Sequence, residues 1–533
     1  MLARGLGLLH PSRAHSAFSA TVVLMAGTFL SSVFGLLRNM YIAWLFGRGT
    51  KADAFMAAFQ LPDQIAYFLV GGAASITFVT ILTRYREAGR DAEGERSLSV
   101  ILTTMYLVLG SAIAAAEIFA PWYVHYFFSG FDTEKAALCV HLTRILLPAQ
   151  LCFFAGGVFG AVLLVRKQFN VQAVAPLIYN LGTIVGGLLL VKKLGITSLA
   201  LGTVAGALCG PFLLNWYFAR KAGVRYRPIL DWHDKGLREW VRLSLPLMAG
   251  VSLVTADMWI INYFASSTDG AIALMTYAKR LFVAPMSMLA QAAGVASMPF
   301  FASLWSQDKR YEFATGVADS VSRVACLGLL ATSAMASMAV PLVDMLFTGG
   351  RFATADSREC ATYFAVFSVS LFLWSAQAIY SRAFYAAGNT FVPMVAGTIV
   401  TVVSLPIYDV LYKTHGAMGL AIASDSGIAM QTLLIASLLH KRRMVSLASL
   451  DFGEMGRCVL AAVVAGGAVA LLVWGVGARL AHHAGTHAHG HARIADLVIL
   501  LAGTVLWLAL VKWVLEKSGS ALPRVTMKRL GLA

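Results

Sequence analysis

Residues 52–86 read ADAFMAAFQLPDQIAYFLVGGAASITFVTILTRYR, and a loosely similar stretch, AIALMTYAKRLFVAPMSMLAQAAGVASMPFFASLW, follows at 271–305. Both stretches are long and apolar. An offset of 219 residues relates these pairs: Ala52 and Ala271, Ala54 and Ala273, Met56 and Met275, and Asn170 and Asn389. A constant offset over a long span is typical of an internal duplication. The chain is therefore predicted to contain two related halves.

The composition is that of a membrane protein. Hydrophobic residues make up 59% of the chain and charged residues 13%, with a mean hydropathy of +0.73. Soluble globular domains carry about a quarter charged residues, so a soluble fold is excluded. A helix that crosses the bilayer needs ~20 mostly apolar residues. About fourteen stretches qualify: 18–46, 52–83, 97–127, 136–164, 172–191, 196–219, 237–265, 270–304, 313–347, 359–386, 391–411, 416–439, 455–480 and 493–515.

These stretches predict an all-α polytopic membrane protein built from two six-helix lobes and two additional C-terminal helices. Six crossings is an even number, so the two lobes enter the membrane with the same orientation and form a parallel repeat. The predicted parts are a cytoplasmic N-terminus (1–17), an N-lobe (18–222), a cytoplasmic linker (223–236), a C-lobe (237–440), helices thirteen and fourteen (441–516) and a cytoplasmic tail (517–533).

The basic residues predict the orientation of the chain. The net charge is +16, which by itself could indicate a nucleic-acid partner. The Lys and Arg residues of the predicted loops lie mainly on one side, however, with 22 on the side of the termini against 10 on the other. Cytoplasmic loops of membrane proteins carry this excess. The charge therefore predicts a multi-pass protein with both termini in the cytoplasm and excludes nucleic-acid binding.

The sequence contains no pattern that indicates an enzyme or a cofactor. HExxH, GxSxG and Walker motifs are absent from it, and the six cysteines are scattered without a CxxC pair. Neither a disulfide framework nor a zinc site is expected. Five histidines gather in the segment AHHAGTHAHGHAR, at 482–491. A solvated loop is the favoured interpretation, with metal binding or pH sensing as the alternative.

Charged residues inside apolar helices are the candidate functional residues, because a charge in the bilayer usually faces a cavity or a partner. Lys279 and Arg280 lie about ten residues into their helix without an acidic neighbour in sequence. They are predicted to bind an anion in a cavity, and the alternative is pairing with a carboxylate such as Asp53 or Asp257. Arg38 has the same two interpretations. Arg144 either reaches the interface or binds a partner, and Asp319 with Arg323 forms an expected local ion pair.

Several motifs resemble those of one known family. They are SSVFGLLRNMYIAWLFGRGTKADAFMAAFQLPD at 31–63, GGAASITFVTIL at 71–82, TRILLP at 143–148, FNVQAVAPLIYN at 169–180, YAKRL at 277–281, RAFYAAGNTFVP at 382–393 and HGAMGLAIA at 415–423. In order and spacing these stretches are similar to the MurJ (MviN) family of lipid II flippases in the MOP superfamily. The resemblance covers residues from about 18 to about 440.

The resemblance implies that the chain moves undecaprenyl-pyrophosphate-linked peptidoglycan precursor across the bacterial inner membrane by alternating access. It implies no cofactor and no ATP site, and it makes the cell-wall synthesis machinery a candidate partner. By motif, Arg38 and Arg280 are expected to line the substrate cavity with Asp53. Lys279, which is adjacent to Arg280, is expected to line the same cavity. Arg382, Arg144 and Asp257 are expected to gate or support it. No metal ligand is expected.

The chain also departs from the family pattern. Ser32, Ala66 and Tyr67 stand where the family usually carries charged residues, and Lys279 stands where an acid is common. Three alternatives therefore stay open. They are a flippase for another lipid-linked oligosaccharide, a cation-coupled exporter of small molecules, and a membrane scaffold that does not transport.

Overall fold

The computed structural model describes residues 17–70, 78, 81–86, 88–166, 168–249, 251–287, 289, 292–483, 489–520 and 522. Most of the predicted cytoplasmic N-terminus (1–17), most of the tail (517–533) and the side chains of the histidine-rich segment lie outside the described residues. The described part is helical. It contains no strand, and a single β-bridge joins Gly349 to Phe352. The predicted all-α class is confirmed.

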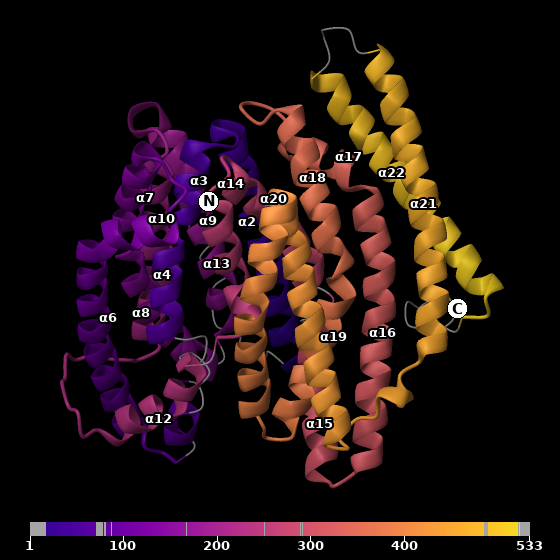
Figure 1. Cartoon of the computed structure of the whole chain (residues 1–533). Coiled ribbons are helices and arrows are strands. Elements are labelled where there is room, and N and C mark those ends of the chain that lie inside the picture. The colour runs from indigo at the N-terminus through magenta and orange to yellow at the C-terminus, as the bar shows by residue number, and fades with distance from the viewer. Residues whose placement is uncertain are drawn as a thin grey trace. The chain divides into compact units, whose positions relative to one another are not determined.

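The chain folds into two compact units (Figure 1). Unit 1 comprises Met1–Ile42 and Gly49–Gly250. Its helices are α2 (Ala17–Phe46, up to Ile42), α3 (Thr50–Ala57), α4 (Gln60–Ile65), the π-helical turn η1 (Ala66–Val70), α6 (Asp91–Phe127), α7 (Thr133–Leu146), α8 (Ala149–Val165), α9 (Phe169–Leu194), α10 (Thr197–Ala207), the π-helical turn η2 (Leu208–Leu214), α11 (Asn215–Lys221) and α12 (Lys235–Ala249).

Unit 2 comprises Ala43–Arg48, which includes the last turn of α2, and Val251–Ala533. Its helices are α13 (Leu253–Ala265), α14 (Ala271–Met286), α15 (Ala292–Ser306), α16 (Arg310–Ser337), α17 (Ala339–Phe347), α18 (Thr354–Val369), α19 (Leu371–Ala386), α20 (Phe391–Lys441), the 3₁₀ turn η4 (Leu447–Ser449), α21 (Phe452–His483) and α22 (His489–Lys517). The two C-terminal helices pack on α16 through an apolar cluster that includes Cys326 and Cys458.

Two long helices of unit 1 begin at nearly the repeat offset from two long helices of unit 2. The long helices α6 and α16 begin 219 residues apart, at Asp91 and Arg310. The helices α9 and α20 begin 222 residues apart, at Phe169 and Phe391. These two offsets agree with the predicted repeat, and the division into two six-helix lobes stays a prediction.

The described residues contain fewer helices of membrane-spanning length than the fourteen predicted segments. Among the described residues nine helices are long and apolar enough to cross a membrane, or ten if the bent pair α18 and α19 is one span. Parts of the predicted segments 52–83 and 270–304 lie outside the described residues. Their described parts are α3, α4 and η1 in the first segment and α14 and α15 in the second, each shorter than a membrane span. The predicted number of fourteen is therefore not confirmed.

Helix α20 contains two of the predicted segments because the chain reverses inside it. Gly416 has φ 58° and ψ −143°, which is not helical. Residues eight apart on a straight helix are ~12 Å apart, yet a Cβ on Gly419 would lie 1.9 Å from the carbonyl oxygen of Leu411. The turn at Gly416 thus separates the segments predicted at 391–411 and 416–439.

Helices α9 and α10 pack in unusually close contact in unit 1. Gly182 and Gly186 on α9 face Gly202 and Gly206 on α10, and a Cβ on Gly202 would lie 2.5 Å from the carbonyl oxygen of Gly182. The hydroxyls of Thr183 and Thr203 hydrogen-bond across the same contact at 2.8 Å. Small residues four apart are the means by which membrane helices approach closely. This GxxxG pattern is present on both helices in the sequence.

Substituting Gly202 by alanine should destabilise unit 1. The new methyl group would overlap backbone, and overpacking of this kind costs ~1–3 kcal/mol. The matched control is Gly110→Ala on α6, where a Cβ would meet nothing within 4 Å. Thermal unfolding of both purified variants in detergent measures the difference. Equal melting temperatures for the two variants would show that α9 and α10 are not held by this contact.

Candidate functional site

A buried ion pair joins α3 to α7 in unit 1. Lys135 Nζ lies 3.2 Å from Asp53 Oδ2, and the side chains are 4% and 1% exposed. Lys135 stands in the first turn of α7, after the N-cap residue Asp132, which accepts a hydrogen bond from the Lys135 backbone N–H at 2.7 Å. Asp53, predicted to line the cavity, thus has a cationic partner from its own unit. Its role in substrate binding stays a prediction.

Arg38 on α2 has the environment of a cation available to a ligand. Its side chain is half-buried, and the guanidinium carbon lies 5.9 Å from the centre of the Tyr179 ring on α9. The Nε atom is buried and has no hydrogen-bond partner among the described residues. A buried donor without an acceptor is unfavourable by ~1–3 kcal/mol. An anion that reached this donor would remove that penalty.

A second buried ion pair lies inside unit 2, between α14 and α13. Lys279 Nζ lies 2.8 Å from Asp257 Oδ2, and the side chains are 9% and 3% exposed. The Lys279 ammonium also donates to Ser424 Oγ at 3.0 Å, and Tyr408 Oη donates to Asp257 Oδ1 at 2.5 Å. The structure therefore brings Lys279 and Asp257 together, which is the pairing left open as the alternative to anion binding.

Aromatic rings surround the Lys279 ammonium as well. Its Nζ lies 4.2 Å from the centre of the Phe367 ring and 5.3 Å from the ring centres of Phe282 and Trp374. Rings at these distances stabilise a cation through their negative faces. Lys279 is thus held by a carboxylate, a hydroxyl and three rings from five helices, and the arrangement favours a structural role within unit 2.

The neighbouring cation, Arg280, has a different environment. Successive residues of an α-helix point ~100° apart, so Arg280 is exposed whereas Lys279 is buried. Arg382 on α19 is half-buried. In unit 1, Arg144 is largely exposed, and its Nε donates to the Glu117 backbone carbonyl at 3.0 Å. The carboxylate of Glu117 lies 3.9 Å away, so Arg144 binds a neighbour on α6.

Within the described ranges, no group of three or more His, Cys, Asp and Glu side chains could hold a metal ion. The histidine-rich segment at 482–491 is not covered by this statement, since its side chains lie outside those ranges.

Comparison with known proteins decides the family. The family model described as "Lipid II flippase MurJ" matches residues 42–488. The chain belongs to the MurJ family. Among curated relatives, the "Probable lipid II flippase MurJ" of Vibrio cholerae is 26% identical over 500 residues, covering 90% of this chain and 95% of that protein. The protein of the same name from Haemophilus influenzae is 29% identical over 461 residues, covering 83% and 90%.

Solved structures support the same fold. "Lipid II flippase MurJ, inward closed conformation" matches with a TM-score of 0.74 at 18% identity, covering 93% of this chain and 99% of that one. An inward-facing multidrug resistance MATE transporter of the MOP superfamily matches with a TM-score of 0.65 at 18% identity, covering 80% and 98%. The predicted MurJ resemblance is confirmed by the family match, and the fold is shared with these two solved transporters.

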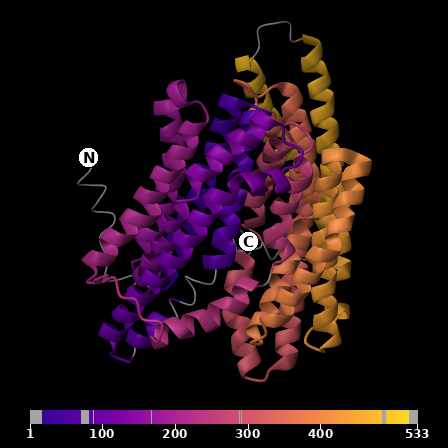
Figure 2. The ribbon, with the colours of Figure 1, turned by 60° about the vertical axis from the view of Figure 1, so that its left-hand side comes forward.

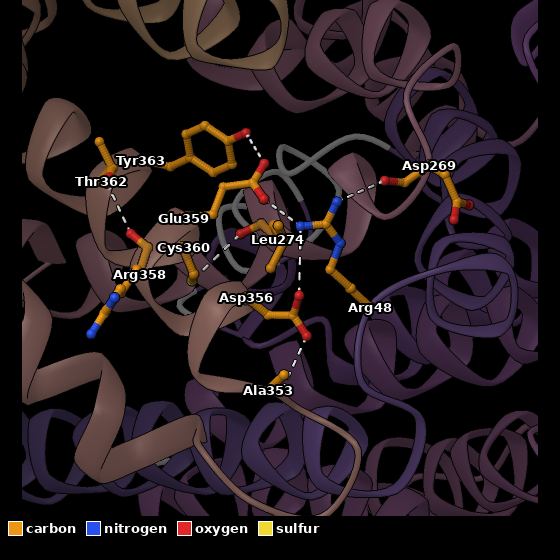
Figure 3. Close-up of polar contacts among 10 residues, drawn as sticks. All are labelled: Arg48, Asp269, Leu274, Ala353, Asp356, Arg358, Glu359, Cys360, Thr362 and Tyr363. Carbon is orange, nitrogen blue, oxygen red and sulfur yellow. Dashed lines mark hydrogen bonds and ion pairs between the residues drawn. The ribbon is translucent and has the colours of Figure 1, made fainter. Parts of the chain in front are cut away.

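A further polar cluster lies around Arg48 in unit 2 of this MurJ-family chain (Figure 3). The sequence did not predict it. Arg48, after the last turn of α2, forms an ion pair with Glu359 and lies 3.6 Å from Asp356 Oδ1, both on α18. It also donates to the Asp269 carbonyl at 3.3 Å, and Tyr363 donates to Glu359 Oε1 at 2.5 Å. The cluster fixes the segment 43–48 to unit 2.

The electrostatics of this cluster stabilise the charged form of Arg48. Burial alone would lower the pKa of Arg48, but the hydrogen bond to Glu359 and the charges of Glu359 and Asp356 outweigh burial and raise the pKa above its usual value. Asp356 also accepts from the Ala353 backbone N–H at 3.1 Å, at the start of α18, where a negative charge is favourable. Arg48 therefore remains charged at any physiological pH.

Lys135 and Arg48 were missed because the sequence places both in predicted outer loops. One signal was available for Lys135. A cation in the first turn of a helix opposes the helix dipole, and Lys135 follows an Asp that is well suited to an N-cap. A lysine in that position needs another partner, which the structure identifies as Asp53. For Arg48 no local pattern indicates Glu359, 311 residues away in sequence.

Proposed function

We propose that this protein is a lipid II flippase, which moves the undecaprenyl-pyrophosphate-linked peptidoglycan precursor from the inner to the outer leaflet of the bacterial inner membrane. The observation that carries the proposal is the MurJ family match over residues 42–488. Relatives named as lipid II flippases cover more than four-fifths of the chain. The family is one of transporters, and the protein is accordingly a transporter and not an enzyme.

The proposed mechanism is alternating access of two six-helix lobes, with the substrate pyrophosphate held by fixed cations. A pyrophosphate bridge, which carries two negative charges, is best bound by guanidinium groups in a site of low dielectric. Arg38, with its unpartnered buried Nε, and Arg280, which is exposed on α14, are the proposed pyrophosphate ligands. Lys279, Asp257 and Asp53 support them by holding helices in place. Arg382 and Arg144 are proposed to gate or support the cavity.

Leaflet distribution of lipid II tests the function most directly. Depleting the protein from its cells should trap lipid II in the inner leaflet, measured by its accessibility to an external probe. The purified protein in liposomes should conversely bring fluorescent lipid II within reach of an external quencher. If the leaflet distribution of lipid II were unchanged in both assays, the proposal would be wrong. Accumulation of a different lipid-linked saccharide would favour the alternative function, a flippase for another lipid-linked oligosaccharide. The departures from the family pattern at Ser32, Ala66 and Tyr67 left that alternative open.

The arginines are expected to affect transport without affecting folding. Arg38→Ala and Arg280→Ala should each weaken pyrophosphate binding by ~1.5–3 kcal/mol, the scale of a charged hydrogen bond, and so lower lipid II flipping about ten-fold or more. The liposome assay measures this loss. The control is Arg323→Ala, since that arginine is exposed and pairs with Asp319 on its own helix at 4.0 Å. If Arg280→Ala flipped lipid II at the wild-type rate, the proposed binding of pyrophosphate by Arg280 on α14 would be wrong.

The proposed orientation places both termini in the cytoplasm. In a cysteine-free background, single cysteines at Gly49 and Ser267 should react with an impermeant maleimide added outside cells. Cysteines at Gly89 and Ser446 should react only after permeabilisation, because the positive-inside rule puts these basic loops in the cytoplasm. Reversed labelling would invert the leaflet from which substrate is loaded. A contact with the cell-wall synthesis machinery is a further proposal, and co-purification with that machinery tests it.

A further inference from the structure

The chain between α11 and the middle of α12 exposes an unusual combination of side chains. Four arginines lie at the surface, together with three apolar residues whose exposed fractions are 41% for Tyr226, 51% for Leu230 and 57% for Trp232. We call these seven residues the linker surface: Arg225, Tyr226, Arg227, Leu230, Trp232, Arg238 and Arg242.

The carboxylates of this region are already engaged and do not neutralise the arginines. Asp231 accepts from Arg96 at 3.1 Å. Asp234 accepts from Ser97 Oγ at 3.1 Å and from the Leu237 backbone N–H. Glu239 pairs with Arg84. Asp231 and Glu239 thus pair with arginines outside the linker surface, and no ion pair among the described residues involves an arginine of the linker surface. The four arginines of this surface are therefore not neutralised by a paired carboxylate among the described residues.

The linker surface is held in place against the end of a membrane helix. Trp240 is 2% exposed, and its ring centre lies 5.7 Å from that of Phe78. The backbone N–H of Arg227 donates to Ser99 Oγ at 3.2 Å, and Ser99 belongs to the candidate membrane span α6. Figures 1 and 2 show α12 running across the end of α6. The surface is thus fixed at the level where a membrane span ends and lipid headgroups begin.

From these observations we infer that the linker surface binds the headgroups of anionic phospholipids in the surrounding bilayer. Arginines at a membrane surface attract anionic lipids, and exposed Trp and Tyr side chains are suited to the interface between headgroups and acyl chains. The combination fits a charged lipid surface better than water, in which Leu230 and Trp232 would remain exposed. This inference requires only membrane insertion and does not depend on which substrate the protein moves.

Quenching of Trp232 by brominated lipids tests the inference. The full-length protein is placed in nanodiscs that contain brominated phosphatidylglycerol or, at the same mole fraction, brominated phosphatidylcholine. The difference between wild type and Trp232→Phe isolates this tryptophan from the others among the 11 of the chain. The anionic lipid is expected to quench Trp232 roughly twofold more than the zwitterionic one, because the local arginines enrich it. Added salt should reduce that preference.

Two variants separate a charge-specific contact from general membrane proximity. The combination of Arg225→Gln, Arg227→Gln, Arg238→Gln and Arg242→Gln should abolish the lipid preference. A control with Gln at Arg90, Arg323, Lys413 and Lys512 should retain it, because each of those residues pairs with an acid within four residues in sequence. Equal quenching by both lipids in wild type, or no quenching, would overturn the inference. If the fourfold Arg→Gln variant fails to fold, the salt dependence of the wild type decides. A preference for the anionic lipid that salt does not reduce would also overturn the inference.

Discussion

Lys279→Ala is expected to lower the free energy of unfolding by ~3–5 kcal/mol, the effect of removing one partner from a buried ion pair. The ammonium is the only cation paired with Asp257 among the described residues, at 2.8 Å, and Asp257 is 3% exposed. Without Lys279 the Asp257 carboxylate keeps one hydrogen bond, from Tyr408, and no opposite charge. A lysine that served only to bind substrate in a wet cavity would give the opposite result, with normal folding and lost transport.

Thermal unfolding of the purified protein in detergent measures this loss as a lower apparent melting temperature. The matched variant combines Lys279→Met with Asp257→Asn, which removes both charges and keeps the volumes similar. Replacing a complete buried pair by uncharged groups is often close to neutral, so the double variant should recover most of the stability. A single variant as stable as wild type would show that the pair does not hold α13 and α14 together.

Asp53→Ala is expected to destabilise unit 1 by a similar ~3–5 kcal/mol. Lys135 would lose its carboxylate while its side chain remains 4% exposed, and its position in the first turn of α7 adds an unfavourable interaction with the helix dipole. The ring of Phe131, whose centre lies 5.2 Å from Nζ, compensates only partly, because a cation–π contact is weaker than a buried ion pair.

A double-mutant cycle on Asp53 and Lys135 measures their coupling. The variants are Asp53→Asn, Lys135→Met and the combination, each followed by thermal unfolding. Groups in direct contact couple by ~0.5–3 kcal/mol, and the combined variant should be more stable than the sum of the single losses predicts. If the stability losses of the two single variants were strictly additive, Asp53 and Lys135 would not be coupled. Asp53 would then be assigned to the substrate cavity alone.

The sequence predicts the helical class, the repeat and the family, because each of these depends on patterns that extend over tens of residues. It also predicts the Asp319–Arg323 pair, which the structure confirms, because residues four apart on a helix are neighbours whatever the tertiary fold. The partner of Lys279 could be narrowed to a few carboxylates but not chosen. Choosing Asp257 requires knowing which faces of α13 and α14 meet.

The remaining features depend on tertiary packing or on local breaks in helices. Asp53 and Lys135 are 82 residues apart, and no short-range pattern connects them. The π-helical turn η2 (Leu208–Leu214) lies within a stretch whose hydropathy is continuous, so a hydropathy count cannot detect it. Gly416 is a partial exception, because glycine between two apolar segments permits the positive φ of the turn.

The close contact of α9 and α10 has a consequence for how the protein is made. Only Gly195 and Ile196 separate the two helices, so the contact between their glycines is local in sequence. Local contacts form quickly, since little chain entropy is lost in closing a short loop. This hairpin can assemble in the membrane once residue 207 has left the translocon, before most of the helices from α13 onward have been synthesised. Those later helices then fold in the presence of a helix pair that is already formed.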